Sequence, residues 1–243
     1  DKCHLIVLGY KHEHIWAQVG EDRIWENKDV KLLGITIDRE LKFDKHVSNI
    51  CSKTSRKLSV LARMSKFLTF DKKRNIFKAF VESQFKYCPL VWMFHNRSTN
   101  NKINRLHERA LRIVYNDYHS SFEQLLINDG SFCIHHQNIQ SLMIEIFKIL
   151  NGMTSNVCNE IFFSRDHEIN LRSHQDLKVP SINSVLQGKN SLRYFGPVIW
   201  NSIPIDIRKS ENLYIFKSKI KTWNPESCTC RLCKEYLDGV GYI

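Results

Sequence analysis

The sequence contains no long hydrophobic run and no N-terminal signal pattern. None of its apolar stretches reaches the roughly 18–20 residues that a membrane-spanning helix needs. The opening residues also lack the apolar segment and small-residue cleavage site of a secretory signal peptide. We therefore expect no membrane partner and an intracellular protein. Residue 1 is Asp rather than Met, so we expect the chain to be part of a longer product.

Paired cysteines are also absent over most of the chain. The first five cysteines, from Cys3 to Cys158, occur singly, and several lie in apolar helical patterns. Such spacing is typical of reduced thiols in an intracellular protein rather than of a disulfide framework.

A cysteine cluster occurs only near the C-terminal end, as Cys228, Cys230 and Cys233. Zinc takes four tetrahedral ligands, often in Cys-x2–4-Cys pairs, and Cys230 and Cys233 have that spacing. No His or Cys follows Cys233, so a fourth ligand would have to come from elsewhere in the chain or from a second molecule. The cluster therefore predicts a Zn²⁺ site, provided that such a fourth ligand is supplied.

Several catalytic motifs are missing as well. The chain has neither a Gly-x-Gly-x-x-Gly pattern nor a Walker pattern, and no two aspartates are adjacent. Cysteine and histidine can act as a nucleophile and its base, and Cys88 and His95 are such a pair. Nothing in the sequence orients them toward each other. The residue types alone therefore do not predict an active site.

Basic residues are in clear excess. Thirty-six Lys and Arg against 25 Asp and Glu give a net charge of +11 and a pI near 9.3. This balance favours a polyanionic partner, of which nucleic acid is the commonest, although a generally basic protein would have the same charge. With 42% hydrophobic residues, the 243-residue chain has the composition of one large globular domain or two small ones.

Short apolar runs predict a small antiparallel β element in residues 1–43. The strand candidates are residues 3–8, 14–19, 23–25 and 30–37, with a turn at Gly20-Glu21-Asp22. Gly34 interrupts the last candidate. A glycine within a strand often marks a close approach by a ligand or another backbone; the alternative is a packing glycine in a core strand. If this is a strand, Gly34→Val should leave folding intact, because valine is β-branched.

Apolar residues at three- and four-residue spacing predict a helical bundle over residues 44–152. The expected helices begin at Asp44, Asp71, Asn101, Ser121 and His135. The apolar face of the first comprises Val47, Ile50, Cys51, Thr54, Leu58 and Leu61, and roughly opposite it lie Lys45, Lys53, Arg56 and Arg63. No Asp or Glu occurs between Lys45 and Phe70, so this row is typical of a surface that follows a phosphate backbone. The alternative is a solvated helix face.

The remaining residues predict two further regions. Residues 164–178 are polar with little periodicity, and the region around them, residues 153–189, is predicted to be a linker or an exposed arm. Residues 190–243 predict a small C-terminal region, with a helix from Ser210 to Trp223 that Ser210 caps. The expected fold class is α+β, mostly α: a small β element, then a helical bundle, then this C-terminal region.

Three segments resemble the C-terminal part of a jockey-type non-LTR retrotransposon (LINE) reverse transcriptase. They are Lys2-Cys3-His4-Leu5-Ile6, the run from Lys31 to Asp38, and the Trp-Asn-x-x-Pro segment that begins at Trp200. The resemblance implies that residues 1–43 are the edge of the palm with a primer-grip strand, and that residues 44–152 are the thumb. It implies RNA and DNA as partners, as an RNA–DNA duplex, together with the upstream palm and fingers of the same polyprotein. The expected location is then the cytoplasm and the nucleus.

The resemblance also implies which residues act. In this family, two adjacent aspartates upstream hold Mg²⁺, so we expect Mg²⁺ in the full-length enzyme and no polymerisation by residues 1–243 alone. Lys2 corresponds to a palm lysine that can protonate pyrophosphate, although a surface lysine at a chain end is the alternative. The primer-grip strand adds Lys31, Leu33 and Gly34 to the basic row as nucleic-acid-binding residues.

Two other classes of function stay open. One is a non-enzymatic basic helical module that binds RNA or a protein partner. The other is an unrelated enzyme, for which the sequence offers no set of catalytic residues.

Overall fold

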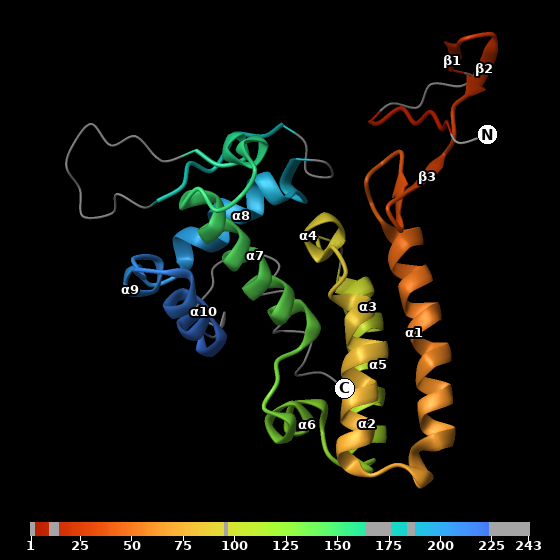
Figure 1. Ribbon diagram of the computed structural model, residues 1–243, viewed down its shortest axis with the longest axis vertical. Coiled ribbons are helices and arrows are strands. Elements are labelled where there is room, and N and C mark those ends of the chain that lie inside the picture. Colours follow the sequence, from red (N-terminus) through yellow and green to blue (C-terminus); the bar gives the residue numbers. More distant parts are fainter. Residues whose placement is uncertain (1–2, 10–14, 95–96, 164–175, 184–187, 224–243) are drawn as a thin grey trace.

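The structure is a computed structural model that describes residues 3–9, 15–94, 97–163, 176–183 and 188–223. These residues form mostly helices and two small antiparallel hairpins, so the predicted α+β, mostly α class is confirmed. Figure 1 shows the hairpins at one end of a long helix, α1, with the other helices arranged beside it. No described helix combines the length and the hydrophobicity that crossing a membrane requires.

The two hairpins are separate sheets. Strand β1 (Trp16–Val19) pairs with β2 (Asp22–Trp25), and β3 (Asp29–Leu32) pairs with β4 (Ile35–Asp38). The predicted strand at residues 3–8 is wrong, because the described part of that segment contributes only a single bridge between Leu5 and Glu26.

The prediction of one continuous strand over residues 30–37 is also wrong. The chain reverses at Leu33 and Gly34, whose φ angles are 46° and 87°. Two consecutive residues with positive φ are typical of the two-residue turns that join hairpin strands. Gly34 therefore lies in a turn, where a residue without a side chain is favoured.

A short connection, held by hydrogen bonds to the side chain of Asp38, joins β4 to helix α1 (Asp44–Met64). The carboxylate of Asp38 accepts hydrogen bonds from the backbone amides of Glu40 (3.1 Å), Lys42 (3.0 Å) and Phe43 (2.6 Å). Phe43, which precedes the helix, has a left-handed backbone with φ of 57°. These bonds satisfy amides that no helix or strand pairs, and they set where α1 begins relative to the second hairpin.

Helix α1 buries the predicted face, including Val47, Ile50 and Leu58. The predicted second helix is segmented: α2 (Phe70–Ile76), a π-helical segment η2 (Phe77–Glu82) and α3 (Ser83–Phe85), with the short η1 (Ser65–Phe67) before it and α4 (Pro89–Trp92) after it. A π-helical segment is rare and often lies next to a functional site.

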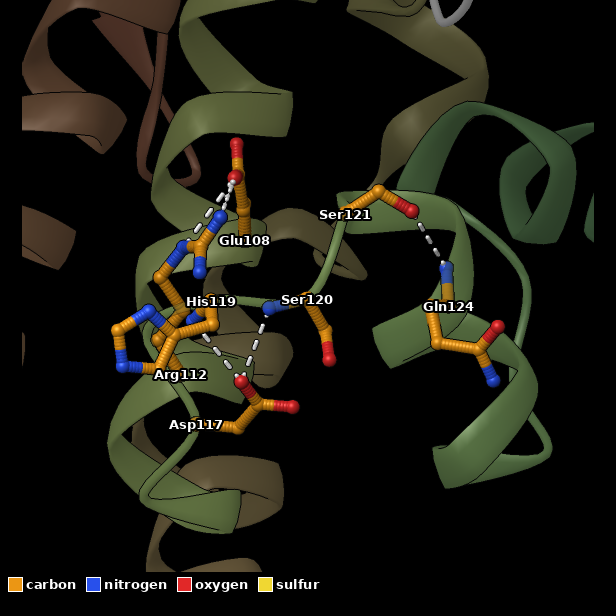
Figure 2. A network of polar contacts seen from close by, with 7 residues as sticks. All are labelled: Glu108, Arg112, Asp117, His119, Ser120, Ser121 and Gln124. Atoms are coloured by element: carbon orange, nitrogen blue, oxygen red, sulfur yellow. Dashed lines mark hydrogen bonds and ion pairs between the residues drawn. The ribbon is translucent and has the colours of Figure 1, made fainter.

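The third predicted helix is α5 (Arg97–Tyr115), and the short helix predicted at Ser121 is α6 (Phe122–Asp129). Figure 2 shows the turn between them, in which Asp117 accepts hydrogen bonds of 3.0 Å from the amides of both His119 and Ser120. Bonds from the Ser120 side chain and these amides lower the pKa of Asp117 to about 2. Ser121 caps α6 by accepting a hydrogen bond from the amide of Gln124.

The C-terminal half consists of α7 (Ile134–Leu150), the 3₁₀ segment η3 (Asn156–Glu160), α8 (Leu192–Ser202), α9 (Ile205–Arg208) and α10 (Leu213–Thr222). The predicted terminal helix is present, but its predicted N-cap is wrong. Asn212 caps it by accepting from the amide of Ile215 at 2.9 Å. The hydroxyl of Ser210 instead donates to the carbonyl of Ile207, at the end of the preceding helix.

Two hydrophobic clusters make up the described core. The first lies among α1, η2, α5 and α6, and the second among α7, α8, α9 and α10, where Phe147 stacks on Phe216 at 4.3 Å. Helix α4 joins them, because Trp92 belongs to the first cluster and the following Met93 and Phe94 belong to the second. The first cluster contains side chains of both α1 and α3, including Ile50 and Phe85, and so packs these two helices together.

Candidate nucleic-acid interface

A cavity of about 710 Å³ lies between the β3–β4 hairpin, the first half of α1 and the segment that follows η2. This volume falls within the range of about 300–1,000 Å³ that small-molecule sites occupy. Its lining residues are Lys31, Gly34, Thr36, His46, Asn49, Ile50, Ser52, Lys53, Arg56, Ser83, Gln84 and Tyr87.

The cavity is basic. Lys31 comes from the hairpin, and Lys53 and Arg56 lie three residues apart on α1, so that their side chains neighbour each other. No acidic residue is among the lining residues, and within the described part of the chain none of the three cations forms an ion pair. Their charge is therefore not neutralised by a neighbouring carboxylate and is available to an anionic ligand.

Two hydrogen bonds attach the hairpin to the helices around the cavity. The phenol of Tyr87 donates to the carbonyl of Leu33 at 2.6 Å. The backbone amide of Thr36 donates to Nδ1 of His46 at 3.2 Å. The wall that carries Lys31 is thus tied both to the end of the second helix and to α1.

His46 is the buried polar residue of this site, with 5% of its surface exposed. Burial, followed by the charge of Lys53, lowers its pKa below the usual 6.5, so the ring is neutral at pH 7. Because Nδ1 accepts a hydrogen bond from Thr36, the proton of the neutral ring is on Nε2. That nitrogen has no hydrogen-bond partner among the described residues.

The structure brings together four of the residues predicted to bind nucleic acid: Lys31, Gly34, Lys53 and Arg56 all line the cavity. Leu33, the neighbour of Gly34 in the turn, projects into solvent with 83% of its surface exposed. These residues come from two segments that the sequence alone does not place side by side.

Two members of the predicted basic row lie elsewhere. The ammonium group of Lys45 pairs with Asp29 of β3 at 2.6 Å, so the interpretation that the row has no acidic partners is wrong for Lys45. The acid comes from a strand rather than from helical spacing, where such partners are normally sought. Arg63 is exposed in the last turn of α1 and does not line the cavity.

Six lining residues were not predicted from the sequence: His46, Asn49, Ser52, Ser83, Gln84 and Tyr87. Asn49 and Ser52 could have been found, because Asn49 lies four residues from Lys53 and Ser52 four residues from Arg56 along one helix. The position of Tyr87 could not, since its partner Leu33 is 54 residues away in the sequence.

The remaining predicted positions lie outside the described residues. These are Lys2 and the cluster of Cys228, Cys230 and Cys233. Within the described ranges, no three His, Cys, Asp or Glu side chains are grouped so that they could hold a metal ion.

Comparisons of the chain with protein-family models, with curated proteins and with solved structures give no match. Function is therefore inferred from the residues and the charge of the cavity.

Proposed function

We propose that this chain is the C-terminal part of a retrotransposon RNA-directed DNA polymerase, and that it grips primer–template nucleic acid at the cavity beside α1. The observation that carries the proposal is the meeting of Lys31, Lys53 and Arg56 at one cavity whose lining contains no acid. Cations without carboxylate partners bind phosphate backbones, and they do so with little dependence on base sequence.

The turn of the second hairpin supports a contact role. Leu33 adopts φ of 46° although it is not a glycine, and its side chain is 83% exposed. A non-glycine residue in this conformation costs about 1–2 kcal/mol, and such strain is often found where a residue serves a ligand. An exposed apolar side chain next to Gly34, which lines the cavity, suits a nucleic-acid strand, which presents apolar sugar and base faces as well as phosphates.

In this proposal, the ligand is an RNA–DNA duplex, and the upstream palm and fingers of the same polyprotein supply the Mg²⁺ ligands and the polymerase reaction. The place of action is the cytoplasm and the nucleus. The cavity also suits a non-enzymatic RNA-binding module, because its cations would attract single-stranded RNA in the same way.

The test measures the affinity of the chain for a fluorescent RNA–DNA duplex over a range of salt concentrations. For the double variant Lys53→Glu with Arg56→Glu, we expect affinity at low salt to fall by at least about tenfold and the salt dependence to become shallower. The matched control is Lys217→Glu with Lys221→Glu on α10, which changes the net charge equally at exposed positions on the far side of the molecule from α1 (Figure 1).

Equal weakening by both pairs would show that net charge alone drives binding, and would contradict the proposed interface. A matched single-stranded RNA distinguishes the two functions. A clear preference for the duplex supports the polymerase part, whereas equal or tighter binding of the single strand favours the RNA-binding module.

A further inference from the structure

An exposed phenylalanine lies next to the basic cavity. Phe80 belongs to the π-helical segment η2 and has 58% of its surface exposed. It precedes Ser83 and Gln84, which line the cavity, by three and four residues. From α1, the ammonium group of Lys57 lies over the Phe80 ring, 6.0 Å from its centroid. Lys57 follows the cavity-lining Lys53 by one helical turn, so the ring adjoins the α1 side of the cavity.

A single exposed apolar side chain needs no explanation, but Phe80 is not isolated. Along α1, Lys53 and Lys57 are followed at the same three- to four-residue spacing by Val60 and Met64, which are both exposed. This stripe begins with cations at the cavity and continues with apolar side chains, and Phe80 meets it at Lys57. A nucleic-acid strand has the same two components, because it carries charged phosphates and apolar base faces.

We propose that Phe80 is a stacking site for one unpaired base of the nucleic-acid strand whose phosphates lie on Lys53, Arg56 and Lys57. This deepens the proposed function and rests on it for the nature of the ligand. None of the three cations forms an ion pair within the described ranges. They favour a polyanion over an apolar protein segment, which would leave their charge unbalanced.

The ligand base is unpaired because stacking on a side chain requires an open base face. Within a duplex, the neighbouring base pairs cover both faces of each base. Single strands instead offer their bases to aromatic side chains, and such stacking tolerates any base. A cation beside the ring, as Lys57 is here, adds attraction of its own to the phosphate next to the stacked base.

The π-helical segment presents the ring without an opposing charge. It buries Phe77 and Val81 and leaves Phe80 exposed. Its one acidic residue, Glu82, is buried and pairs with Lys86 at 3.1 Å, so this carboxylate is already neutralised. π-helical segments are rare and often lie at functional sites, which agrees with a contact role for Phe80.

The experiment compares the affinity of the chain for three RNA–DNA duplexes that differ at one end. The first is blunt, the second has a short overhang of RNA adenosines, and the third has an abasic overhang of the same length. The two overhangs carry the same phosphates, so the difference between them measures base contacts alone. For the unmodified chain, we expect the adenosine overhang to bind at least about fivefold more tightly than the abasic one.

Phe80→Leu should abolish this difference and leave the affinity for the blunt duplex unchanged, whereas Phe80→Tyr should preserve the difference. The matched control is Phe67→Leu, which should also preserve it. Phe67 is another exposed phenylalanine with a lysine ammonium over its ring, that of Lys66 at 4.9 Å. It follows the end of α1 that lies away from the hairpins (Figure 1).

Equal affinities of the unmodified chain for the two overhangs would overturn the stacking site, and this comparison does not depend on the folding of a variant. An undiminished difference in Phe80→Leu, or an equal loss in Phe67→Leu, would overturn it as well.

The blunt duplex separates this inference from the proposed function. If Lys53→Glu with Arg56→Glu weakens blunt-duplex binding but the adenosine overhang gives no advantage, the interface is supported and the stacking site is overturned. If Phe80→Leu abolishes the advantage while that double variant binds the blunt duplex normally, the stacking site is supported and the proposed duplex interface is overturned.

Discussion

The phenol of Tyr87 donates a 2.6 Å hydrogen bond to the carbonyl oxygen of Leu33, which ties the β3–β4 turn to the segment after α3. Gly34 lies against the same ring, because a Cβ placed on it would be 3.6 Å from Cε1 of Tyr87. One aromatic side chain thus supports both residues of the turn. The hairpin wall of the cavity depends on this contact.

Tyr87→Phe removes the hydrogen bond and keeps the ring. The free energy of unfolding should fall by about 1 kcal/mol or less, since water can reach the exposed Leu33 carbonyl. Hydrogen exchange at the amides of residues 31–36 should become faster, and duplex affinity should decrease severalfold. The control is Tyr214→Phe, at an exposed tyrosine on α10. Unchanged exchange in the turn would show that Tyr87 does not restrain it.

The turn residues should respond in opposite directions to substitution. Leu33→Asn places a residue that tolerates positive φ at an exposed position, so it should stabilise the hairpin by about 1 kcal/mol. Gly34→Ala should destabilise it by about 1 kcal/mol, because φ of 87° strains any residue with a Cβ even though Tyr87 leaves room for one. Chemical unfolding measures both changes.

The expectation that Gly34→Val would leave folding intact rested on a premise that is wrong. It assumed a strand backbone, in which valine is favoured, whereas φ at this position is 87°. If Leu33→Asn stabilises the fold and also weakens duplex binding, the strain at Leu33 serves the ligand. A stabilised variant with full affinity would contradict a contact role for the leucine.

The helices were predictable because their signals are local. The stripe of Val47, Ile50 and Leu58 repeats every three or four residues and needs no knowledge of the partner helix. The turn at Leu33-Gly34 was missed because Leu-Gly lacks the Asn or Asp that usually marks a two-residue hairpin turn. In a short apolar run, periodicity does not reveal where a strand reverses.

The site was predictable only in part, for a similar reason. Lys53 and Arg56 could be found as neighbours on a helix, but the pairing of Lys45 with Asp29 joins two different elements. His46 was hidden because a histidine on the buried face of a helix looks like an ordinary core residue. Its hydrogen bond from the backbone amide of Thr36 joins two elements, and its other ring nitrogen has no hydrogen-bond partner among the described residues.

Gly196→Ala tests the packing of α8 in the second cluster. A Cβ at this buried position would lie 2.6 Å from Cε1 and 2.9 Å from Cζ of Phe162. We expect a loss of about 1–3 kcal/mol in the free energy of unfolding, although alanine favours helices over glycine by about 1 kcal/mol. Adding Phe162→Leu removes the clashing ring atoms, so the double variant should lose less than the sum of the two single losses. Simple additivity would show that Phe162 is not the obstacle.

His107 should make stability fall with pH below neutrality. It is 1% exposed, it stacks on Phe77, and neither ring nitrogen has a hydrogen-bond partner among the described residues. Burial lowers its pKa from 6.5 to about 4, outweighing the opposite effect of Asp129. Between these values the unfolded chain binds a proton that the folded chain does not, so this stability is present above pH 6.5 and is lost as pH falls toward 4.

Between pH 7 and pH 5, His107 should therefore lower the free energy of unfolding by roughly 2 kcal/mol. His107→Leu should lack this contribution, so the curves of stability against pH for wild type and variant should diverge as pH falls, with the variant relatively more stable at pH 5. Urea unfolding at several pH values gives the free energy of unfolding of both chains. Subtracting one from the other removes the contribution of the other histidines, which both chains share. The control is His119→Leu, at an exposed histidine. Curves for His107→Leu and wild type that stay parallel from pH 7 to pH 5 would show that His107 does not titrate differently in the folded and unfolded chains.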